Sequence, residues 1–331
     1  MSFLNEIKKI LDKSTLRIDR YLQMMNEPHR YYHNLKHVEE LFNLINKFYK
    51  DDPDKEDLQQ LATMHDIIYN PKQINGENEK QSADFMAGMF YVTDNSRKLY
   101  NAIIDTATHK NYSSELSRKF GELDMYILKS EFVSDLIEYE NQIMKEYQFV
   151  DYSVYKQKRL EFLTSLDENE YPNIFQLIDY VQNRKISVGI YSGSFNPFHI
   201  GHQYILNQAD LLFDKVIINI GYNPDKINEH TEKNVDYLKS KLYHQVDNFK
   251  GLLADYFNQF QDNLYSNVTI IRGIRNEKDL EFEQTQLQYL LDLNPNIKMI
   301  FIPTKLELSH ISSSGIKTLQ KFNTSVDKYL I

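Results

Sequence analysis

One stretch near the middle of the chain restricts the possible folds more than any other. Residues 186–206 read ISVGIYSGSFNPFHIGHQYIL: an apolar run to Tyr191, a turn rich in Gly, Ser, Asn and Pro, and a helical pattern from His199 onward. This order predicts a strand, a tight turn and a helix. The N-terminus of such a helix offers unpaired N–H groups and the positive end of its dipole, so the turn is suited to hold a phosphate.

Two histidines frame the first turn of this expected helix. His199 and His202 are three residues apart and share one face. Gly201 lies between them and removes a side chain where a ligand or phosphate would approach the backbone. Histidines at a helix start can also be solvated caps. The pattern H-x-G-H on a strand–turn–helix nevertheless combines two imidazoles, a missing side chain and an anion site, and we interpret it as a nucleotide site.

The residues after 186 alternate between strand and helix patterns. We predict strands at 186–191, 215–221, 268–273 and 297–303, and helices at 200–213, between 235 and 260, and at 277–293. Such alternation predicts a Rossmann-like α/β domain with a parallel sheet and right-handed crossovers. Ligands of these folds bind at the carboxyl ends of the strands.

Charged and hydroxyl side chains follow the predicted strand ends. Lys226 follows the second strand, Arg272 and Arg275 follow the third, and Ser312–Ser314 open the last helix. The cations would neutralise a polyphosphate, and the serines would add hydroxyl and N–H donors. Alternatively, the two arginines pair with carboxylates of the neighbouring helix. Those carboxylates are Asp279, Glu281 and Glu283.

The first half of the chain has a different pattern. Residues 1–183 carry apolar side chains at three- and four-residue spacing and few alternations typical of strands, which predicts an all-α domain. One such helical stripe consists of Val38, Leu41, Ile45 and Phe48. No long flexible linker separates this domain from the second domain, residues 186–331.

Histidine and carboxylate side chains recur along these helices. His37 begins one helix, His65 and Asp66 lie near the end of another expected at 58–68, and Asp124 lies on a helix expected at 115–129. Adjacent helical residues point about 100° apart, so one ion takes both only with ligands from other helices. Two imidazoles and two carboxylates suit a divalent first-row metal with open positions for water. Each histidine alone would more often be a hydrogen-bonded core residue.

Composition excludes several classes of function. The 331-residue chain has a net charge of −9 and no cysteine. The charge disfavours nucleic acid and anionic membranes as partners, and the missing thiols exclude disulfides and zinc–thiolate sites. The N-terminus lacks the apolar core of a signal peptide, and no run is long enough for a membrane span. We therefore expect a cytoplasmic protein.

The first half resembles the HD-domain metal-dependent phosphohydrolases. The segments RYYHNLKHVEELF, MHDIIYNP, ENEKQSA, TATHK and ELDMYIL follow that family's signature in order, with EYQFVDYSVYKQKRLEFL as a fainter tail. The resemblance implies a divalent transition metal (Mn, Ni, Co or Fe) on His37, His65, Asp66 and Asp124. It places His33, Glu79 and His109 on the substrate side. The implied chemistry is hydrolysis of a phosphate ester by metal-activated water. The alternative is a helical scaffold that has lost activity.

The second half resembles the phosphopantetheine adenylyltransferases of the H-x-G-H superfamily. GSFNPFHIGH, NPDK, FKGLLADY, IIRGIRNEKDLEFE and SHISSSGIK match in order over residues 187–321. The three serines of the last motif favour that family over nicotinamide mononucleotide adenylyltransferases, which usually carry a threonine and an arginine there. The resemblance implies transfer of adenylyl from ATP, carrying Mg²⁺, to 4′-phosphopantetheine, giving dephospho-coenzyme A and pyrophosphate. It also implies a homo-oligomer.

Residue roles follow from this second resemblance. His202 would donate to the α-phosphate, Ser194 and Lys226 would hold the attacking phosphate, and Arg272 would bridge substrate and nucleotide. Those four form the expected catalytic set. The residues implied to bind ATP are Gly193, Ser194, His199, Gly201, His202, Arg275, Glu283, Ser312, Ser313 and Ser314. Those implied to bind the acceptor are Ser194, Lys226, Leu252, Leu253 and Arg272, the two leucines contacting the pantetheine arm.

The chain departs from the usual pattern of that family at three positions. His199 stands where many members have a polar residue, Ser194 replaces a threonine, and Asn196 replaces an aspartate. Our main hypothesis is a bifunctional enzyme, a phosphohydrolase fused to an adenylyltransferase. The alternatives are an adenylyltransferase acting on nicotinamide mononucleotide or another phosphorylated acceptor, and a nucleotide-sensing protein with one regulatory domain.

Overall fold

The computed structural model describes residues 3–90, 94–221, 231–260 and 263–331, and it divides into two compact units. The helical unit comprises Met1–Glu146 and Glu161–Tyr180, and the sheet unit comprises Tyr147–Leu160 and Val181–Ile331. The predicted domain ranges, 1–183 and 186–331, differ from these units in one main respect. Tyr147–Leu160 groups with the sheet rather than with the helices that precede it.

Hydrogen bonds explain why this segment belongs to the sheet unit. The buried ammonium of Lys215 donates to the carbonyls of Gln148 and Val150, at 2.6 Å for Val150. The backbone N–H of Gln245 donates to Gln148 O at 3.2 Å, and that of Val216 donates to Gln148 Oε1 at 3.3 Å. The segment therefore satisfies polar groups at the start of two strands. Lys215, Gln148 and Gln245 are polar and do not belong to any periodic pattern of apolar residues. The apolar pattern of the sequence therefore could not reveal that residues 147–160 pack against the sheet.

In its described residues the helical unit consists of helices, apart from one isolated bridge between Ser14 and Phe90. Its elements are α1 (Phe3–Leu11), α2 (Ile18–Met25), α3 (Leu35–Phe48), α4 (Lys55–Met64), α5 (Glu77–Met89), α6 (Asp94–Asp105), α7 (Glu115–Asp124), the 3₁₀ turn η1 (Met125–Lys129) and α8 (Val133–Glu146). The division between the units falls within α9 (Tyr152–Leu163) and α10 (Ile174–Asn183). None of the described helices is both long and apolar enough to cross a membrane.

The core of the helical unit forms around α3. Asn34 caps this helix by accepting a hydrogen bond from Lys36 N at 2.8 Å. Val38, Leu41 and Ile45 are at most 1% exposed, and burying each such side chain stabilises the fold by roughly 1.5–3 kcal/mol. Phe48, predicted to continue the stripe, is 46% exposed because α3 ends there.

Two of the helices predicted in the helical unit end earlier than expected, as does the helix predicted at 200–213, which ends at Asp210. The helix predicted at 58–68 ends at Met64, so His65 and Asp66 lie just beyond α4. The buried guanidinium of Arg30 donates to the carbonyls of Asp66 and Ile67 at 2.7 and 3.1 Å, replacing helical partners. The helix predicted at 115–129 changes from α-helix to the 3₁₀ turn η1 after Asp124.

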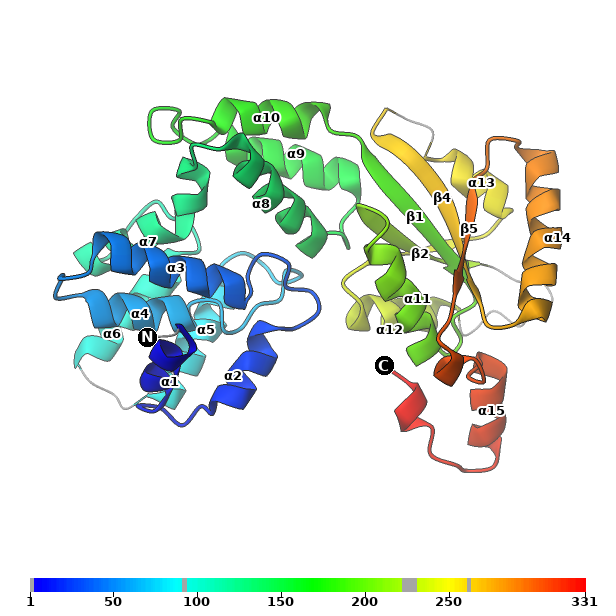
Figure 1. The fold of residues 1–331 in the computed structure, drawn as a ribbon, viewed down its shortest axis with the longest axis horizontal. Coiled ribbons are helices and arrows are strands. Elements are labelled where there is room, and N and C mark those ends of the chain that lie inside the picture. Colours follow the sequence, from blue (N-terminus) through cyan, green and yellow to red (C-terminus); the bar gives the residue numbers. More distant parts are fainter. Residues whose placement is uncertain (1–2, 91–93, 222–230, 261–262) are drawn as a thin grey trace. The chain divides into compact units, whose positions relative to one another are not determined.

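The described residues of the sheet unit form five parallel strands in the order β3-β2-β1-β4-β5. They are β1 (Ile186–Gly193), β2 (Lys215–Gly221), β3 (Gln245–Phe249), β4 (Tyr265–Ile274) and β5 (Met299–Pro303). The helices are α11 (Ile200–Asp210), α12 (Thr231–Lys241), α13 (Leu253–Asn258), α14 (Glu277–Leu293) and α15 (Ser313–Lys321), with 3₁₀ turns η3 (Leu306–Leu308) and η4 (Asp327–Tyr329). The parallel sheet flanked by helices confirms the predicted Rossmann-like architecture (Figure 1).

The position of β1 in the sheet determines where a ligand can bind. After β1 the chain adds β2 and β3 on one side, then crosses to add β4 and β5 on the other. The carboxyl ends of β1 and β4 therefore border the crevice where the strand order reverses. Strand β3 was predicted as part of a helical region. It is a short edge strand in which Val246 alone is buried, so it lacks the apolar run of the central strands.

Candidate functional site

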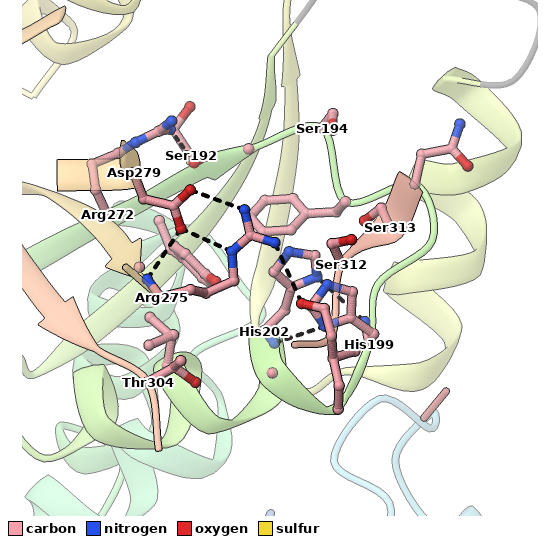
Figure 2. Close-up of a pocket in the computed structure, with 18 of the residues that line it drawn as sticks. Ser192, Ser194, His199, His202, Arg272, Arg275, Asp279, Thr304, Ser312 and Ser313 are labelled. Atoms are coloured by element: carbon pink, nitrogen blue, oxygen red, sulfur yellow. Dashed lines mark hydrogen bonds and ion pairs between the residues drawn. The ribbon is translucent and has the colours of Figure 1, made fainter. Parts of the chain in front are cut away.

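A cavity of about 580 Å³ opens at the carboxyl ends of β1, β4 and β5 in the sheet unit (Figure 2). Most of the predicted nucleotide-site residues line it. They are Gly193, Ser194, His199, Gly201, His202, Arg272, Arg275, Glu283, Ser312, Ser313 and Ser314. The carboxyl ends of these strands and of β2, with the N-termini of α11 and α15, thus supply one concave site.

The two histidines cap α11 reciprocally. His199 is the N-cap residue, and its backbone N–H donates to Nδ1 of His202 at 3.3 Å. The backbone N–H of His202 donates to Nδ1 of His199 at 3.4 Å, and the two rings stack with centroids 3.6 Å apart (Figure 2). Because each Nδ1 is an acceptor, each neutral ring carries its proton on Nε2. The cap therefore leaves two Nε2–H donors for the site.

Burial keeps both rings neutral. Burial, together with the smaller effect of the positive charge of Arg275, lowers the pKa of His199 from 6.5 to about 4. Burial likewise lowers the pKa of His202 well below 6.5, with smaller contributions from His199 and Arg275. At neutral pH both side chains are therefore uncharged hydrogen-bond donors. They can donate to a ligand without adding positive charge to the site.

The structure gives a more specific reason for a glycine at position 201 than the sequence suggested. A Cβ at this position would lie 3.1 Å from Cε1 and Nδ1 of the His199 ring. The missing side chain thus makes room for the stacked imidazole, whereas we had expected it to clear a path for the ligand alone. At Gly193 an added Cβ would lie 2.9 Å from the ring of Phe195, which itself has a positive φ of 44°.

Three elements hold the turn before α11 in place. The amide of Asn234 on α12 donates to the carbonyls of Ser194 and Phe195 at 3.3 and 3.0 Å. Ser313 Oγ, at the start of α15, donates to Pro197 O at 2.9 Å. An isolated antiparallel bridge joins Leu330 to His199. The turn is therefore fixed before any ligand binds, which favours pre-organised catalysis.

Both arginines of the site are paired with carboxylates of α14. Arg272 Nε lies 2.7 Å from Glu283 Oε2, and its Nη1 donates to Ser192 O. Arg275 Nε and Nη2 lie 2.8 and 2.9 Å from the two oxygens of Asp279. The pairing that sequence analysis raised as an alternative is thus present, at Asp279 and Glu283. Both arginines also line the cavity. A phosphate bound there must therefore compete with these carboxylates for the two guanidinium groups.

Several lining residues were not predicted from the sequence. Thr304 follows β5 and has a buried Oγ1 without a hydrogen-bond partner. Lys317 lies on α15, and Asn234 and Asp279 also reach the cavity. Thr304 could have been found by the same strand-end rule that selected Arg272. Asn234 does not follow a stretch whose sequence predicts a strand, so the strand-end rule could not select it.

Two predicted residues are not brought to this cavity. Leu252 is 55% exposed and precedes α13, and Leu253 is half-buried in the first turn of that helix. Neither lines the cavity, so their contact with a pantetheine arm stays a prediction. Lys226 lies outside the described residues.

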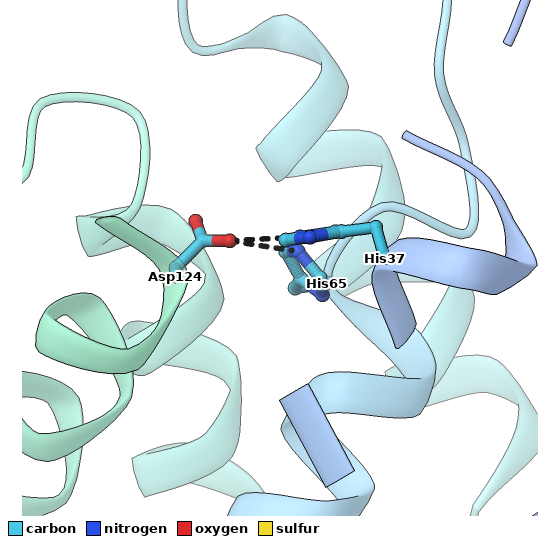
Figure 3. Close-up of side chains that lie close together, drawn as sticks. All are labelled: His37, His65 and Asp124. Carbon is cyan, nitrogen blue, oxygen red and sulfur yellow. Dashed lines mark hydrogen bonds and ion pairs between the residues drawn. The ribbon is translucent and has the colours of Figure 1, made fainter. Parts of the chain in front are cut away.

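A second cluster lies in the helical unit. His37 of α3, His65 after α4 and Asp124 at the end of α7 converge (Figure 3), with candidate ligand atoms within 4.8 Å of one another. Nε2 of His37 is 3.0 Å from Asp124 Oδ1, and Nε2 of His65 is 3.4 Å from the same oxygen. Asp66, the fourth predicted ligand, is outside this set. Its Oδ2 lies 2.9 Å from His65 Nε2.

The hydrogen bonding of this cluster fits a metal ligand set. His65 is 2% exposed, and neither of its ring nitrogens has a hydrogen bond of acceptable geometry despite the nearby carboxylates. Buried polar atoms are normally satisfied, so such a nitrogen needs another partner. Imidazole nitrogens with carboxylate oxygens suit a divalent first-row ion, and ligands separated by these distances can share one.

The predicted substrate-side residues surround the same cluster. His109 Nε2 lies 3.3 Å from Asp124 Oδ2. Glu79 is half-buried with its Oε2 unpartnered, and burial raises its pKa. Burial alone would lower the pKa of His33, but the carboxylates of Glu146, Asp66 and Asp124 together outweigh burial and raise that pKa to about 9.

Glu146 is a contributor that sequence analysis did not assign. It is fully buried and accepts hydrogen bonds from the backbone of Tyr32 and His33, from the His33 ring at 2.6 Å and from Tyr69 Oη at 2.6 Å. It therefore orients His33. Glu146 is the first residue of the EYQFVDYS segment, the fainter tail of the family resemblance, and the resemblance assigned no role to that segment.

Comparisons with known proteins identify relatives of the sheet unit. The cytidylyltransferase-like family model matches residues 190–319. The phosphopantetheine adenylyltransferase of Chromobacterium violaceum is 37% identical over 134 residues, covering 39% of this chain and 80% of that relative. The enzymes of the same name from Cytophaga hutchinsonii and Clostridium tetani are 35% and 33% identical, covering 43% and 41% of this chain and 95% and 86% of their own lengths.

Proposed function

Since this chain belongs, through its sheet unit, to the phosphopantetheine adenylyltransferase family, we propose that this unit transfers the adenylyl group of ATP to 4′-phosphopantetheine. The products are dephospho-coenzyme A and pyrophosphate. The observation that carries the proposal is the reciprocal histidine cap, which places two neutral Nε2–H donors in a cavity bordered by two arginines.

The reaction needs positioning and charge stabilisation rather than a covalent intermediate. An oxygen of the acceptor phosphate forms a bond to the α-phosphorus as the bond to the β-phosphate oxygen breaks and pyrophosphate leaves. His202 donates to the α-phosphate as negative charge redistributes there, and Ser194 holds the attacking phosphate. Arg272 leaves Glu283 to bind acceptor and nucleotide. Mg²⁺ arrives on the triphosphate, coordinated mainly by phosphate and water.

The N-terminus of α15 supports binding of the β- and γ-phosphates. Ser312 accepts a hydrogen bond from Gly315 N at 3.1 Å, which leaves the preceding N–H groups of the first turn directed toward the cavity end of the helix. Arg275 lies beside this end, with its Nη1 3.5 Å from Ile311 O. Release of Arg275 from Asp279 would place its charge against the triphosphate.

The experiment is release of pyrophosphate from MgATP with a panel of phosphorylated acceptors. We expect turnover with 4′-phosphopantetheine, and a much smaller rate with nicotinamide mononucleotide. The reverse preference would show that the acceptor is a mononucleotide. ATP binding without turnover on any acceptor would favour the nucleotide-sensing alternative and contradict the transferase proposal.

We propose a second function for the helical unit, metal-dependent hydrolysis of a phosphate ester. Its specific support is the cluster of His37, His65 and Asp124, in which buried His65 has no hydrogen bond of good geometry. Asp66 would complete the set from beside His65. A divalent ion there lowers the pKa of bound water toward neutrality. Glu79 and His33, the latter oriented by Glu146, would manage protons and charge on the substrate side.

Metal uptake tests this second proposal without depending on activity. Metal-free protein exposed to Mn²⁺, Ni²⁺, Co²⁺ or Fe²⁺ should bind about one ion per chain by elemental analysis. His65→Ala should lose that ion, whereas His310→Ala should retain it, because His310 is exposed and lies in the sheet unit. Equal uptake by both variants would contradict the assignment.

A further inference from the structure

A second cavity, of about 480 Å³, lies between α3 and α8 within the helical unit. Its volume falls in the range of small-molecule sites, about 300–1,000 Å³. Its lining includes His37 and Asp124, so one end of the cavity is formed by the candidate metal cluster. We call it the α3–α8 cleft. Neither resemblance assigns it a ligand, and it does not include His33, Glu79 or His109.

The walls of the α3–α8 cleft are largely apolar and aromatic. Four aliphatic side chains contribute, together with three tyrosines: Leu41, Leu44, Leu123, Ile127, Tyr32, Tyr126 and Tyr139. The ring of Tyr32 joins the cleft to the cluster, because its centroid lies 4.7 Å from that of His37 and 4.7 Å from that of Tyr139. A ligand touching His37 would therefore extend along an apolar wall.

The charged side chains of the cleft disfavour a polyanion. Apart from Asp124, its lining carries three carboxylates, on Glu40, Asp135 and Glu138, and two ammonium groups, on Lys36 and Lys47. Lys36 already lies 3.3 Å from Glu138 and 3.8 Å from Glu40. The excess of carboxylates would repel additional phosphates placed away from the metal end.

These observations together specify the shape of a substrate. We propose that the helical unit hydrolyses phosphate monoesters of extended, uncharged alcohols, whose body lies in the α3–α8 cleft and whose phosphate meets the His37–Asp124 end. The inference rests on the hydrolase function proposed above. In the step, a water oxygen forms a bond to phosphorus, the ester P–O bond breaks, and the alcohol oxygen takes a proton. The products are the alcohol and inorganic phosphate.

4′-Phosphopantetheine belongs to this class, because a single phosphate ends a long uncharged arm. It is also the acceptor proposed for the sheet unit. If both proposals hold, the two halves of the chain compete for one metabolite, one adenylylating it and the other removing its phosphate. Sugar phosphates and nucleoside triphosphates lie outside the class, since their bodies are strongly hydrated or carry further charge.

The test measures phosphate release by the metal-loaded full chain without ATP, so that adenylyl transfer cannot occur. We expect kcat/KM for 4′-phosphopantetheine to exceed that for glucose 6-phosphate and ATP by tenfold or more. Leu44→Trp, which fills the cleft, should remove this preference. Leu4→Trp, at an exposed position of α1, should retain it. Glu138→Lys, at an exposed rim position, should shift the preference toward ATP.

A binding measurement tests the α3–α8 cleft independently of hydrolytic activity. Calorimetric titration of metal-free protein with pantetheine, which lacks the phosphate, should show, besides any binding at the acceptor site of the sheet unit, a site that Leu44→Trp abolishes and Leu4→Trp preserves. Hydrolysis of all esters without preference, together with binding unaffected by Leu44→Trp, would overturn the inference while the hydrolase function stands. Metal uptake without hydrolysis of any ester would overturn the hydrolase proposal itself, and the inference with it.

Discussion

Removal of the His202 ring is the sharpest perturbation of the proposed transfer. His202→Ala deletes the Nε2–H donor and also the Nδ1 atom that accepts the His199 N–H at 3.3 Å. Loss of one pre-organised donor to a developing phosphate charge costs roughly 100- to 1,000-fold in kcat, or about 2.7–4 kcal/mol, by analogy with oxyanion-hole donors. Loss of the capping hydrogen bond should also lower the free energy of unfolding by about 1 kcal/mol.

The two effects are separable by experiment. We expect kcat and kcat/KM for pyrophosphate release to fall together by about 100-fold or more, with KM for ATP nearly unchanged, since the donor acts mainly in the transition state. Urea titration would measure the smaller stability loss. His202→Gln, which keeps an amide donor, should recover part of the rate. A fall in ATP affinity as large as the fall in kcat would refute the assigned role.

Three further predictions concern the same turn and its surroundings. Gly201→Ala should lower transferase kcat at least tenfold, since the new Cβ would lie 3.1 Å from the His199 ring. The control Gly88→Ala, with nothing within 4 Å of its Cβ, should leave kcat unchanged. Equal kcat values for the two variants would contradict this prediction. Because the pKa of His199 is about 4 in the folded state and near 6.5 when unfolded, the unfolded chain binds more protons between these values, so the free energy of unfolding should decrease as pH falls from 6.5 to 4. His199→Gln should flatten that decrease in urea titrations, and an identical slope would contradict the buried neutral ring. Deleting residues 327–331, which bridge His199 through Leu330, should lower kcat while metal uptake stays intact, and an unaltered kcat would show that the bridge is dispensable.

The sequence predicted those parts of the fold that periodicity encodes. Central strands β1, β2 and β4 are buried on both faces and appear as apolar runs, so their order and parallel pairing follow from alternation with helices. Strand β3 and the docking of residues 147–160 depend on polar contacts such as Gln148 with Lys215. These contacts have no hydrophobic period, and the sequence could not reveal them.

Site prediction had a similar limit. Strand-end reasoning selected Arg272, and the motif selected His202, because both depend on position along the chain. The pairing of Arg272 with Glu283 depends on side-chain rotamers, which a pattern does not specify. Glu146 orients His33 across more than a hundred residues of sequence, and no local motif marks such a partner. Gly201 was selected correctly as a special position, but its neighbour, a stacked imidazole, is visible only in three dimensions.

The central claim is that the cavity at the carboxyl ends of β1 and β4 is where ATP meets the acceptor phosphate. A crystal structure of the full chain with α,β-methylene-ATP, Mg²⁺ and 4′-phosphopantetheine tests it most directly. The account predicts the α-phosphate within about 3 Å of His202 Nε2, the hydrogen-bond distance for such a donor, with Arg272 released from Glu283 onto phosphate. A nucleotide bound elsewhere, or an α-phosphate beyond reach of His202, would contradict it.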